Sequence, residues 1–397
     1  MLKGITRSGM TGIKTFEMRA AKRPLASLGL LMGTFCLTLL TDGVSHAAVM
    51  YTFTNLGIPS GIVGSQAFGA YIQATGINDL GEVVGNAADD FNHTSFSWQN
   101  GQLISLGGFS ANAINNSGAI VGNSSGNASI YQNGILSLLP RLSNSDNTAY
   151  TTAGASGINN NGTVVGGGGI GDNFNGTSRA GIFATGGSIV LPNLGGLSAN
   201  ANGINDSGTI VGVAVNTSGE GRAFRYSGGP SLTDLGTLGG SSATAIAINA
   251  GGEIVGSAAL TGNTASHAFI DVANQMIDLG TLGGTSSTAD AINILGQVVG
   301  SSNISGNSEN HAFIYQGGVM TDLNSLIQPG LGADLQSATG INSSGWIVGT
   351  GFFGTGHFPK AYLLVPISVP EPASCGTLLI GGAAMLLRRR QRSSRSA

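Results

Sequence analysis

The stretch "NDSGTIVG", from Asn205 to Gly212, is one copy of a pattern that recurs along this chain. The pattern is Asn-x-x-Gly-x-[Ile/Val]-Val-Gly, and an isoleucine precedes every copy. Seven copies begin at Asn78, Asn115, Asn159, Asn205, Asn249, Asn293 and Asn342, at spacings of 37, 44, 46, 44, 44 and 49 residues. Repeats of this length indicate that one supersecondary unit is built seven times.

Each copy predicts a β-hairpin. Type I turns favour Asn at the first position and Gly at the fourth, and the Asn side chain can accept a hydrogen bond from the backbone two residues on. Apolar runs flank the turn, as in "ATAIAI" before Asn249 and "EIVGSAAL" after it. The Ile-Val pair does not alternate with polar residues, which predicts a strand buried on both faces. The closing Gly predicts a place where backbones approach closely.

Two further strands follow each hairpin. One begins with "HAFI" at His267 and His311, with looser copies at Thr94, Arg222 and Lys360. The other is "LTDLGTLGG" or "MIDLGTLGG", with weaker copies elsewhere. Four short strands per ~44 residues is typical of a β-propeller blade. We therefore predict an all-β fold, a seven-bladed β-propeller; the alternative is an open β-solenoid, which also stacks Gly- and Asn-rich repeats.

The two ends of the repeat region predict how the ring closes. "YTFTNLGIPSG", Tyr51 to Gly61, resembles the fourth strand of a unit. The seventh unit stops after its third strand, at "KAYLLVP". We expect the N-terminal strand, residues 51–57, to pair with Ala361 to Leu364 and complete the last blade. Closure would remove exposed strand edges, which are aggregation sites.

Composition limits the partners. Charged residues make up 9% of the chain, against ~25% in typical soluble domains. Residues 49–369 carry 16 acidic and 5 basic side chains. This acidic body excludes nucleic acid as a partner, because phosphate binding needs a basic surface. Cys36 and Cys375 both lie outside it, so no intramolecular disulfide can staple it.

The N-terminus predicts export. Four basic residues lie between Lys14 and Arg23, and 16 uncharged residues follow from Leu25 to Leu40. Ser45 and Ala47 then have the spacing of a cleavage site. This order is that of a secretory signal peptide, which we assign to residues 1–47. The apolar run is shorter than the ~20 residues that a membrane span needs.

The C-terminus, residues 367–397, has three parts. They are the motif Pro370, Glu371 and Pro372, an apolar run of 15 residues from Ala373 to Leu387, and the cluster Arg388, Arg389 and Arg390. The arginines favour a cytoplasmic tail behind a short transmembrane segment. This order resembles the PEP-CTERM sorting signal of Gram-negative bacteria. The resemblance implies transient anchoring in the inner membrane, then cleavage near the motif by an exosortase and delivery to the cell surface or medium.

The repeats themselves resemble the HAF family of extracellular repeats, best between Asn205 and Ile314. That family implies no established activity. For residues 48–366 we expect a non-enzymatic surface or extracellular-matrix module that binds exopolysaccharide or protein and needs no cofactor. One alternative is a glycan-acting propeller enzyme, a hydrolase or lyase. Another is an ice- or surface-adsorbing protein, which would need regularly spaced Thr.

Several polar side chains could carry chemistry. His267 and His311 occupy the same strand position in successive units, so we expect a structural role. The Asp residues that precede a Leu in the fourth strand, Asp234, Asp278 and Asp322, are expected to accept turn or strand-end hydrogen bonds rather than bind cations. "ADDFNHTS" (88–95) and "GDNFNGTS" (171–178) carry oxygen ligands but lack the terminal Glu of a calcium loop. The sequence thus predicts no catalytic or metal site.

Overall fold

The computed structural model describes residues 50–59, 71–89, 92–143, 150–170, 177–184, 186–354 and 358–367. The described chain is all-β, as predicted, with one short 3-10 helix, η1 (Leu323–Leu326). No helix in these segments is long and apolar enough to cross a membrane. The predicted signal peptide with Ala47, and the sorting residues from Pro370 to Arg390, lie outside the described residues.

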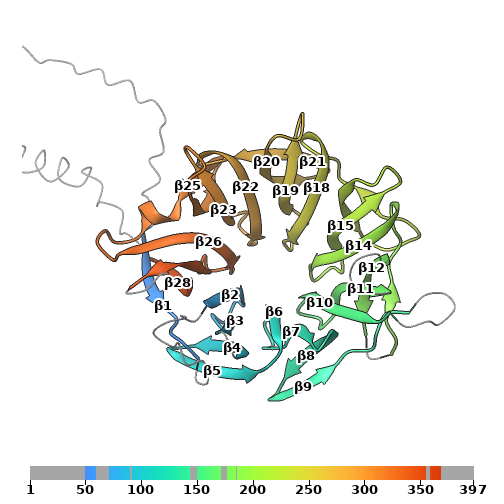
Figure 1. Cartoon of the computed structure of the whole chain (residues 1–397), viewed down its shortest axis with the longest axis horizontal. Helices are drawn as coiled ribbons and strands as arrows, with labels where there is room; N and C mark the ends of the chain where they lie inside the picture. The colour runs from blue at the N-terminus through green and yellow to red at the C-terminus, as the bar shows by residue number, and fades with distance from the viewer. Residues whose placement is uncertain are drawn as a thin grey trace, which may run out of the picture. The chain divides into compact units, whose positions relative to one another are not determined.

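The strands form small antiparallel sheets of four in sequence order (Figure 1). The first three units contain β2 (Tyr71–Ile77), β3 (Val83–Ala88), β4 (His93–Gln99) and β5 (Gln102–Gly107); β6 (Ser110–Ile114), β7 (Ile120–Ser124), β8 (Asn127–Gln132) and β9 (Ile135–Leu138); and β10 (Thr152–Ile158), β11 (Val164–Ile170), β12 (Thr177–Phe183) and β13 (Ile189–Val190).

The next three units contain β14 (Gly195–Ile204), β15 (Ile210–Asn216), β16 (Gly221–Tyr226) and β17 (Thr233–Asp234); β18 (Gly239–Ile248), β19 (Ile254–Leu260), β20 (Ser266–Val272) and β21 (Gln275–Gly280); and β22 (Gly283–Ile292), β23 (Val298–Ile304), β24 (Asn310–Gln316) and β25 (Val319–Asp322). The last two of these join into one sheet through a single parallel pair, Ser266 and Ser286.

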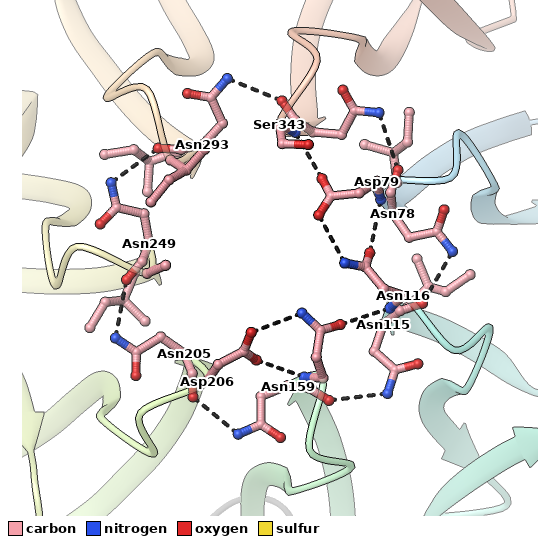
Figure 2. A pocket seen from close by; sticks show the side chains of 18 of the residues that line it. Asn78, Asp79, Asn115, Asn116, Asn159, Asn205, Asp206, Asn249, Asn293 and Ser343 are labelled. Carbon is pink, nitrogen blue, oxygen red and sulfur yellow. Dashed lines mark hydrogen bonds between the residues drawn. The ribbon is translucent and has the colours of Figure 1, made fainter.

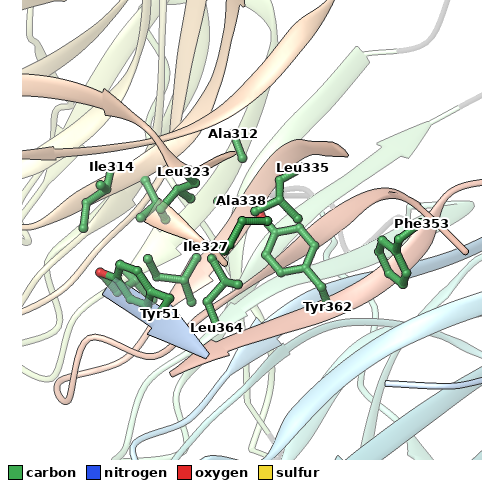
Figure 3. Close-up of a cluster of buried hydrophobic side chains, with 13 residues drawn as sticks. Tyr51, Ala312, Ile314, Leu323, Ile327, Leu335, Ala338, Phe353, Tyr362 and Leu364 are labelled. Atoms are coloured by element: carbon green, nitrogen blue, oxygen red, sulfur yellow. The ribbon is translucent and has the colours of Figure 1, made fainter. Parts of the chain in front are cut away.

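The last sheet combines both ends of the described chain. It contains β26 (Ala333–Ile341), β27 (Ile347–Phe353), β28 (Lys360–Ile367) and, beside β28, β1 (Met50–Asn55). Phe53 pairs with Leu364, so the predicted pairing of the N-terminal strand is confirmed. Tyr51 lies in the buried cluster with Ile327 and Leu364 (Figure 3).

The "IVG" of the repeat lies in the core, as predicted. Val83 and Val84 of β3 are both fully buried, because the sheets pack on both faces of this strand. At Gly85, a Cβ atom would overlap the backbone oxygen of Gln73 on β2. The Phe of each "HAF" motif, such as Phe269, is also fully buried. The same residues therefore recur from unit to unit because each of them packs in the core of its unit.

One expected boundary is wrong. The sequence predicts that the segment "LTDLGTLGG" lies whole in the fourth strand of a unit, but β17 contains only Thr233 and Asp234. The final Gly-Gly begins β18 of the next unit. Between them the Thr237 hydroxyl donates to the backbone oxygen of Gly240 and turns the chain. The motif is thus the crossover between two units.

Candidate functional site

The Asn-x-x-Gly turns have the geometry that the sequence predicts. In the fourth unit the backbone N–H of Gly208 donates to the Asn205 oxygen, and that of Asn205 donates to Thr209. The Asn205 Oδ1 atom accepts from the backbone N–H of Thr209 at 3.0 Å. The same backbone pairs occur at all seven turns.

The seven turn asparagines are also joined to one another. The Nδ2 atom of each donates to the backbone oxygen of the next, at 3.0 to 3.2 Å, and Asn342 donates to Asn78. We call these seven residues, Asn78, Asn115, Asn159, Asn205, Asn249, Asn293 and Asn342, the asparagine ring. Their exposures lie between 3% and 6%. Because both ends of each amide are committed to backbone partners, the asparagine ring is part of the scaffold.

A pocket of about 460 Å³ opens at the centre of the asparagine ring (Figure 2). Each turn contributes an Ile, the ring Asn and the residue after it. Only this last position varies in chemistry, and we call it the rim. The rim residues are Asp79, Asn116, Asn160, Asp206, Ala250, Ile294 and Ser343.

Five rim residues form a continuous polar arc: Ser343, Asp79, Asn116, Asn160 and Asp206. The Ser343 N–H donates to Asp79 Oδ1 at 2.9 Å, and Asn116 Nδ2 donates to Asp79 Oδ2 at 2.8 Å. Asn116 N–H donates to Asn160 Oδ1 at 2.9 Å. Asn160 donates to Asp206 through its N–H at 2.8 Å and its Nδ2 at 2.9 Å. These bonds fix the side chains before any ligand arrives.

The polar arc carries two carboxylates. Partial burial raises the pKa of Asp79, but hydrogen bonds from the Ser343 N–H, the Asn116 amide and the Ser343 hydroxyl outweigh it, so the pKa is lowered. Asp79 is therefore ionised at neutral pH. Asp206 is held by the equivalent donors of Asn160 (Figure 2).

The other two rim residues, Ala250 and Ile294, interrupt the polar arc. Neither side chain can donate or accept a hydrogen bond. Ile294 is 53% exposed and its neighbour Leu295 is 69% exposed. Beside them a second groove, of about 560 Å³, shares Asn249 and Ile294 with the central pocket. The rim is thus polar on one side and open and apolar on the other.

The residues singled out in the sequence lie away from this pocket, on the third and fourth strands. His267 Nδ1 lies 2.9 Å from Asp278 and His311 Nδ1 lies 2.6 Å from Asp322. Arg222 pairs with Asp234 in the same way, at 3.1 Å. Each pair joins two strands of one unit, and nothing brings the histidines together.

The three aspartates also make the expected turn bonds. Asp234 accepts from the Gly236 N–H and Asp278 from the Gly280 N–H, at 2.9 and 2.7 Å. Asp322 accepts from the Asn324 N–H at 2.9 Å. The sequence reasoning predicted these bonds but missed the pairing with the basic residue. Spacing carries part of that signal, because the two members of each pair lie 11 or 12 residues apart in these three units.

The rim and the second groove were also missed. Within the described segments no three His, Cys, Asp or Glu side chains are placed to hold a metal ion. Parts of the two oxygen-rich loops, residues 90–91 and 171–176, lie outside those segments. The signal for the rim is in the sequence, since it is the variable residue directly after an invariant Asn.

Comparison with known proteins names no family. No family model matches the chain, and no curated protein matches it. Among solved structures, TolB from Acinetobacter baumannii is similar at 14% identity and a TM-score of 0.41, over 64% of each chain. A putative gluconolactonase is similar at 11% identity and a TM-score of 0.40, over 80% of this chain and 94% of that one. Such identities transfer no activity.

Proposed function

We propose that the repeats form a seven-bladed β-propeller closed by β1. The pairing of β1 with β28 supports closure, and so does the packing of β2 against β26 and β27. Asn342 donates to Asn78 and Thr339 donates to the Ala74 oxygen, bonds between the last unit and the first. An open solenoid would separate these units.

We propose that this propeller is an exported, non-enzymatic module that binds a polyhydroxylated ligand such as exopolysaccharide. The polar arc is the observation that carries this proposal. Its amides offer donors and acceptors and its carboxylates offer acceptors, fixed in place at the mouth of a concave pocket. Neighbouring sugar hydroxyls present the same mixture. A volume of about 460 Å³ lies within the range of small-molecule sites.

The chemistry of Asp79 supports binding rather than hydrolysis. Most glycosidases use a pair of carboxyl groups, one of them kept protonated by a raised pKa so that it can act as the acid. In the polar arc the pKa of Asp79 is lowered instead. Each oxygen of both arc carboxylates accepts a hydrogen bond from a neighbour, which fixes the carboxylate and leaves lone pairs to accept from ligand hydroxyl groups.

One observation favours the second candidate, a glycan-acting enzyme. Burial raises the pKa of Asp290 to about 7. This residue lies on β22, three positions before the ring residue Asn293. If it were the general acid, Asp290→Asn would abolish glycan cleavage by the protein; retained cleavage would exclude that role. An ice-binding role finds less support, because the rim is concave and has no Thr.

Binding is tested on the mature protein from the native host. Titration calorimetry with the host's purified exopolysaccharide should give saturable binding. Asn116→Ala removes the centre of the polar arc and should weaken binding at least tenfold. Asn303→Ala, a surface change outside the pocket, should leave binding unchanged. Equal affinity of all three proteins would place the ligand elsewhere.

We also propose the export route implied by the two terminal signals. Processing by signal peptidase and an exosortase would leave a protein that begins near Ala48 and ends near Pro370–Pro372, at the cell surface or in the medium. Terminal sequencing of the released protein tests this. An intact arginine tail at residues 388–390 on released protein would contradict sorting.

A further inference from the structure

Arg225 differs from the other basic side chains of the described body. Four of the five are committed to protein acceptors: Arg141 to Asn127, Arg179 to Leu197, Arg222 to Asp234 and Lys360 to Phe353. The side chain of Arg225 makes no hydrogen bond or ion pair with any described residue, although its charge acts on the nearby Asp271. Its guanidinium donors are therefore available to a ligand.

The repeat shows that the fold does not require arginine at this position. Arg225 pairs with Val211, the valine of the "IVG" motif. The residues that pair with that valine in the other units are Ser97, Ile130, Ile182, Ile270, Ile314 and Leu363. Five of these six are branched aliphatic residues. An arginine here departs from what packing selects in the same fold, which points to a role in binding.

Arg225 lines the groove beside the central pocket. Thr209 and Ser227 line it too and supply hydroxyl groups. The groove meets the pocket at Asn249 and Ile294, on the side where the small rim residue Ala250 interrupts the polar arc. A chain of sugars can therefore extend from the polar arc across this gap towards Arg225.

Two acidic residues near Arg225 leave its donors free. Glu253 lines the same groove, but its carboxylate accepts from Asn249 Nδ2 at 2.7 Å. Asp271 is 1% exposed and lies below the surface. Burial raises the pKa of Asp271, while a bond from Asn274 and the charge of Arg225 lower it. Neither Glu253 nor Asp271 forms an ion pair with Arg225 within 4 Å, so neither carboxylate occupies its guanidinium donors, although both lie near it.

We propose that Arg225 binds the carboxylate of a uronic acid that belongs to the same saccharide chain as the sugar held in the polar arc. This inference rests on the proposed glycan-binding function and names the ligand class as acidic polysaccharide. A planar guanidinium can hold a carboxylate through two parallel hydrogen bonds. The Thr209 and Ser227 hydroxyls then lie in the same groove for the neighbouring sugar hydroxyls.

The test uses Arg225→Ile in the mature protein, since isoleucine occupies this position in four other units. The ligands are a uronic-acid tetrasaccharide, the same tetrasaccharide with its carboxyl groups reduced to alcohols, and a sulfated tetrasaccharide. The natural protein should bind the uronate at least tenfold more tightly than the reduced form. Arg225→Ile should remove this preference and leave the affinity for the reduced form unchanged. Asn116→Ala should weaken both equally.

Four outcomes would overturn the proposal. They are a uronate preference that survives Arg225→Ile, equal loss of both ligands in that variant, tighter binding of the sulfated ligand, and natural protein that binds the reduced form as well as the uronate. Binding of neither ligand by the natural protein would instead overturn the glycan-binding function itself. Unchanged circular dichroism of Arg225→Ile confirms that the variant is folded.

Discussion

The two sides of the rim are built on the same scaffold and differ in one residue per unit. Below the polar arc and below the gap at Ala250 and Ile294, the asparagine ring makes the same hydrogen bonds at nearly the same distances. Directly above it, one side carries carboxylates and amides and the other carries a methyl and a branched aliphatic group. The ring Asn is fixed by folding, whereas the rim residue is free to serve binding.

Deletion of residues 50–57 should have the largest effect, because both sides of the rim depend on the last sheet. The deletion removes Tyr51 and Phe53 from the cluster around Leu364 and exposes the edge of β28. Each large buried side chain contributes ~1.5–3 kcal/mol, against a total stability of ~5–15 kcal/mol. We expect aggregation or a strongly lowered unfolding temperature.

Size-exclusion chromatography and thermal unfolding measure this outcome. Tyr51→Phe is the matched control, since it keeps the ring and removes only the hydroxyl, and it should behave like the natural protein. A truncated protein that remains monomeric and melts normally would exclude ring closure by β1 and favour an open array, where each repeat contacts only its neighbours.

Asn205→Ala should cause the next largest loss of stability. It removes an amide that accepts from Thr209 N–H and donates to the Asn249 oxygen, both in a buried place. An unsatisfied buried group costs ~1–3 kcal/mol, so we expect a loss of ~3 kcal/mol in the free energy of unfolding. Asn116→Ala, one residue beyond the ring, should cost less than ~1 kcal/mol. Urea unfolding distinguishes the two, and equal losses would refute the division into scaffold and rim.

The sequence predicts the turns that form the asparagine ring better than it predicts the rim residues. Seven identical Asn-x-x-Gly turns predict hairpins, spacing predicts four strands per unit, and the uneven ends predict the pairing of Phe53 with Leu364. These three predictions depend on the chemistry of short segments or on the number of strands in each unit. Which rim residues face one pocket depends on how the units curve around a centre, and pattern alone does not contain that curvature. The hydrogen bond between His267 and Asp278 is harder to predict, because it depends on the register of two strands as well as on spacing.

Asp290 on β22 differs from the residues at the equivalent position of other units, three residues before the ring Asn. At the equivalent position Asn112 donates to the Ala155 oxygen and Asn202 to the Ala245 oxygen, both at 2.7 Å. Thr75 and Thr339 donate in the same way. The carboxyl group of Asp290 makes no such bond to a described residue, and an ionised carboxylate has no proton to donate. Among these five residues, Asp290 is therefore the one whose charge at neutral pH is unfavourable in its buried place.

Asp290→Asn should stabilise the protein at neutral and alkaline pH. Burial raises the pKa of Asp290 to about 7, against ~3.9 in the unfolded chain. The folded state thus holds a proton that the unfolded state has released, so stability falls as pH rises from about 4 to about 7. About three pKa units correspond to ~4 kcal/mol, and because Asp290 is only half-buried by surface area we expect the variant to gain about half of this, ~2 kcal/mol, at pH 8. Little gain is expected at pH 4. Urea unfolding at both pH values measures it; a gain that does not depend on pH would contradict the titration.

Ala250→Asn should have the smallest effect, because it extends the polar arc across the gap. In the existing arc every side chain except that of Ser343 accepts from the rim N–H of the preceding unit, as Asp206 accepts from Asn160 at 2.8 Å. An asparagine at 250 would accept from the Asp206 N–H and add ~0.5–1 kcal/mol of stability. It would also narrow the passage to Arg225, so affinity for the uronate ligand should fall several-fold while stability rises. Ala250→Ser, too short to reach, is the control in calorimetry and urea unfolding. A stabilised variant with unchanged uronate binding would mean that the ligand does not cross the rim at this point.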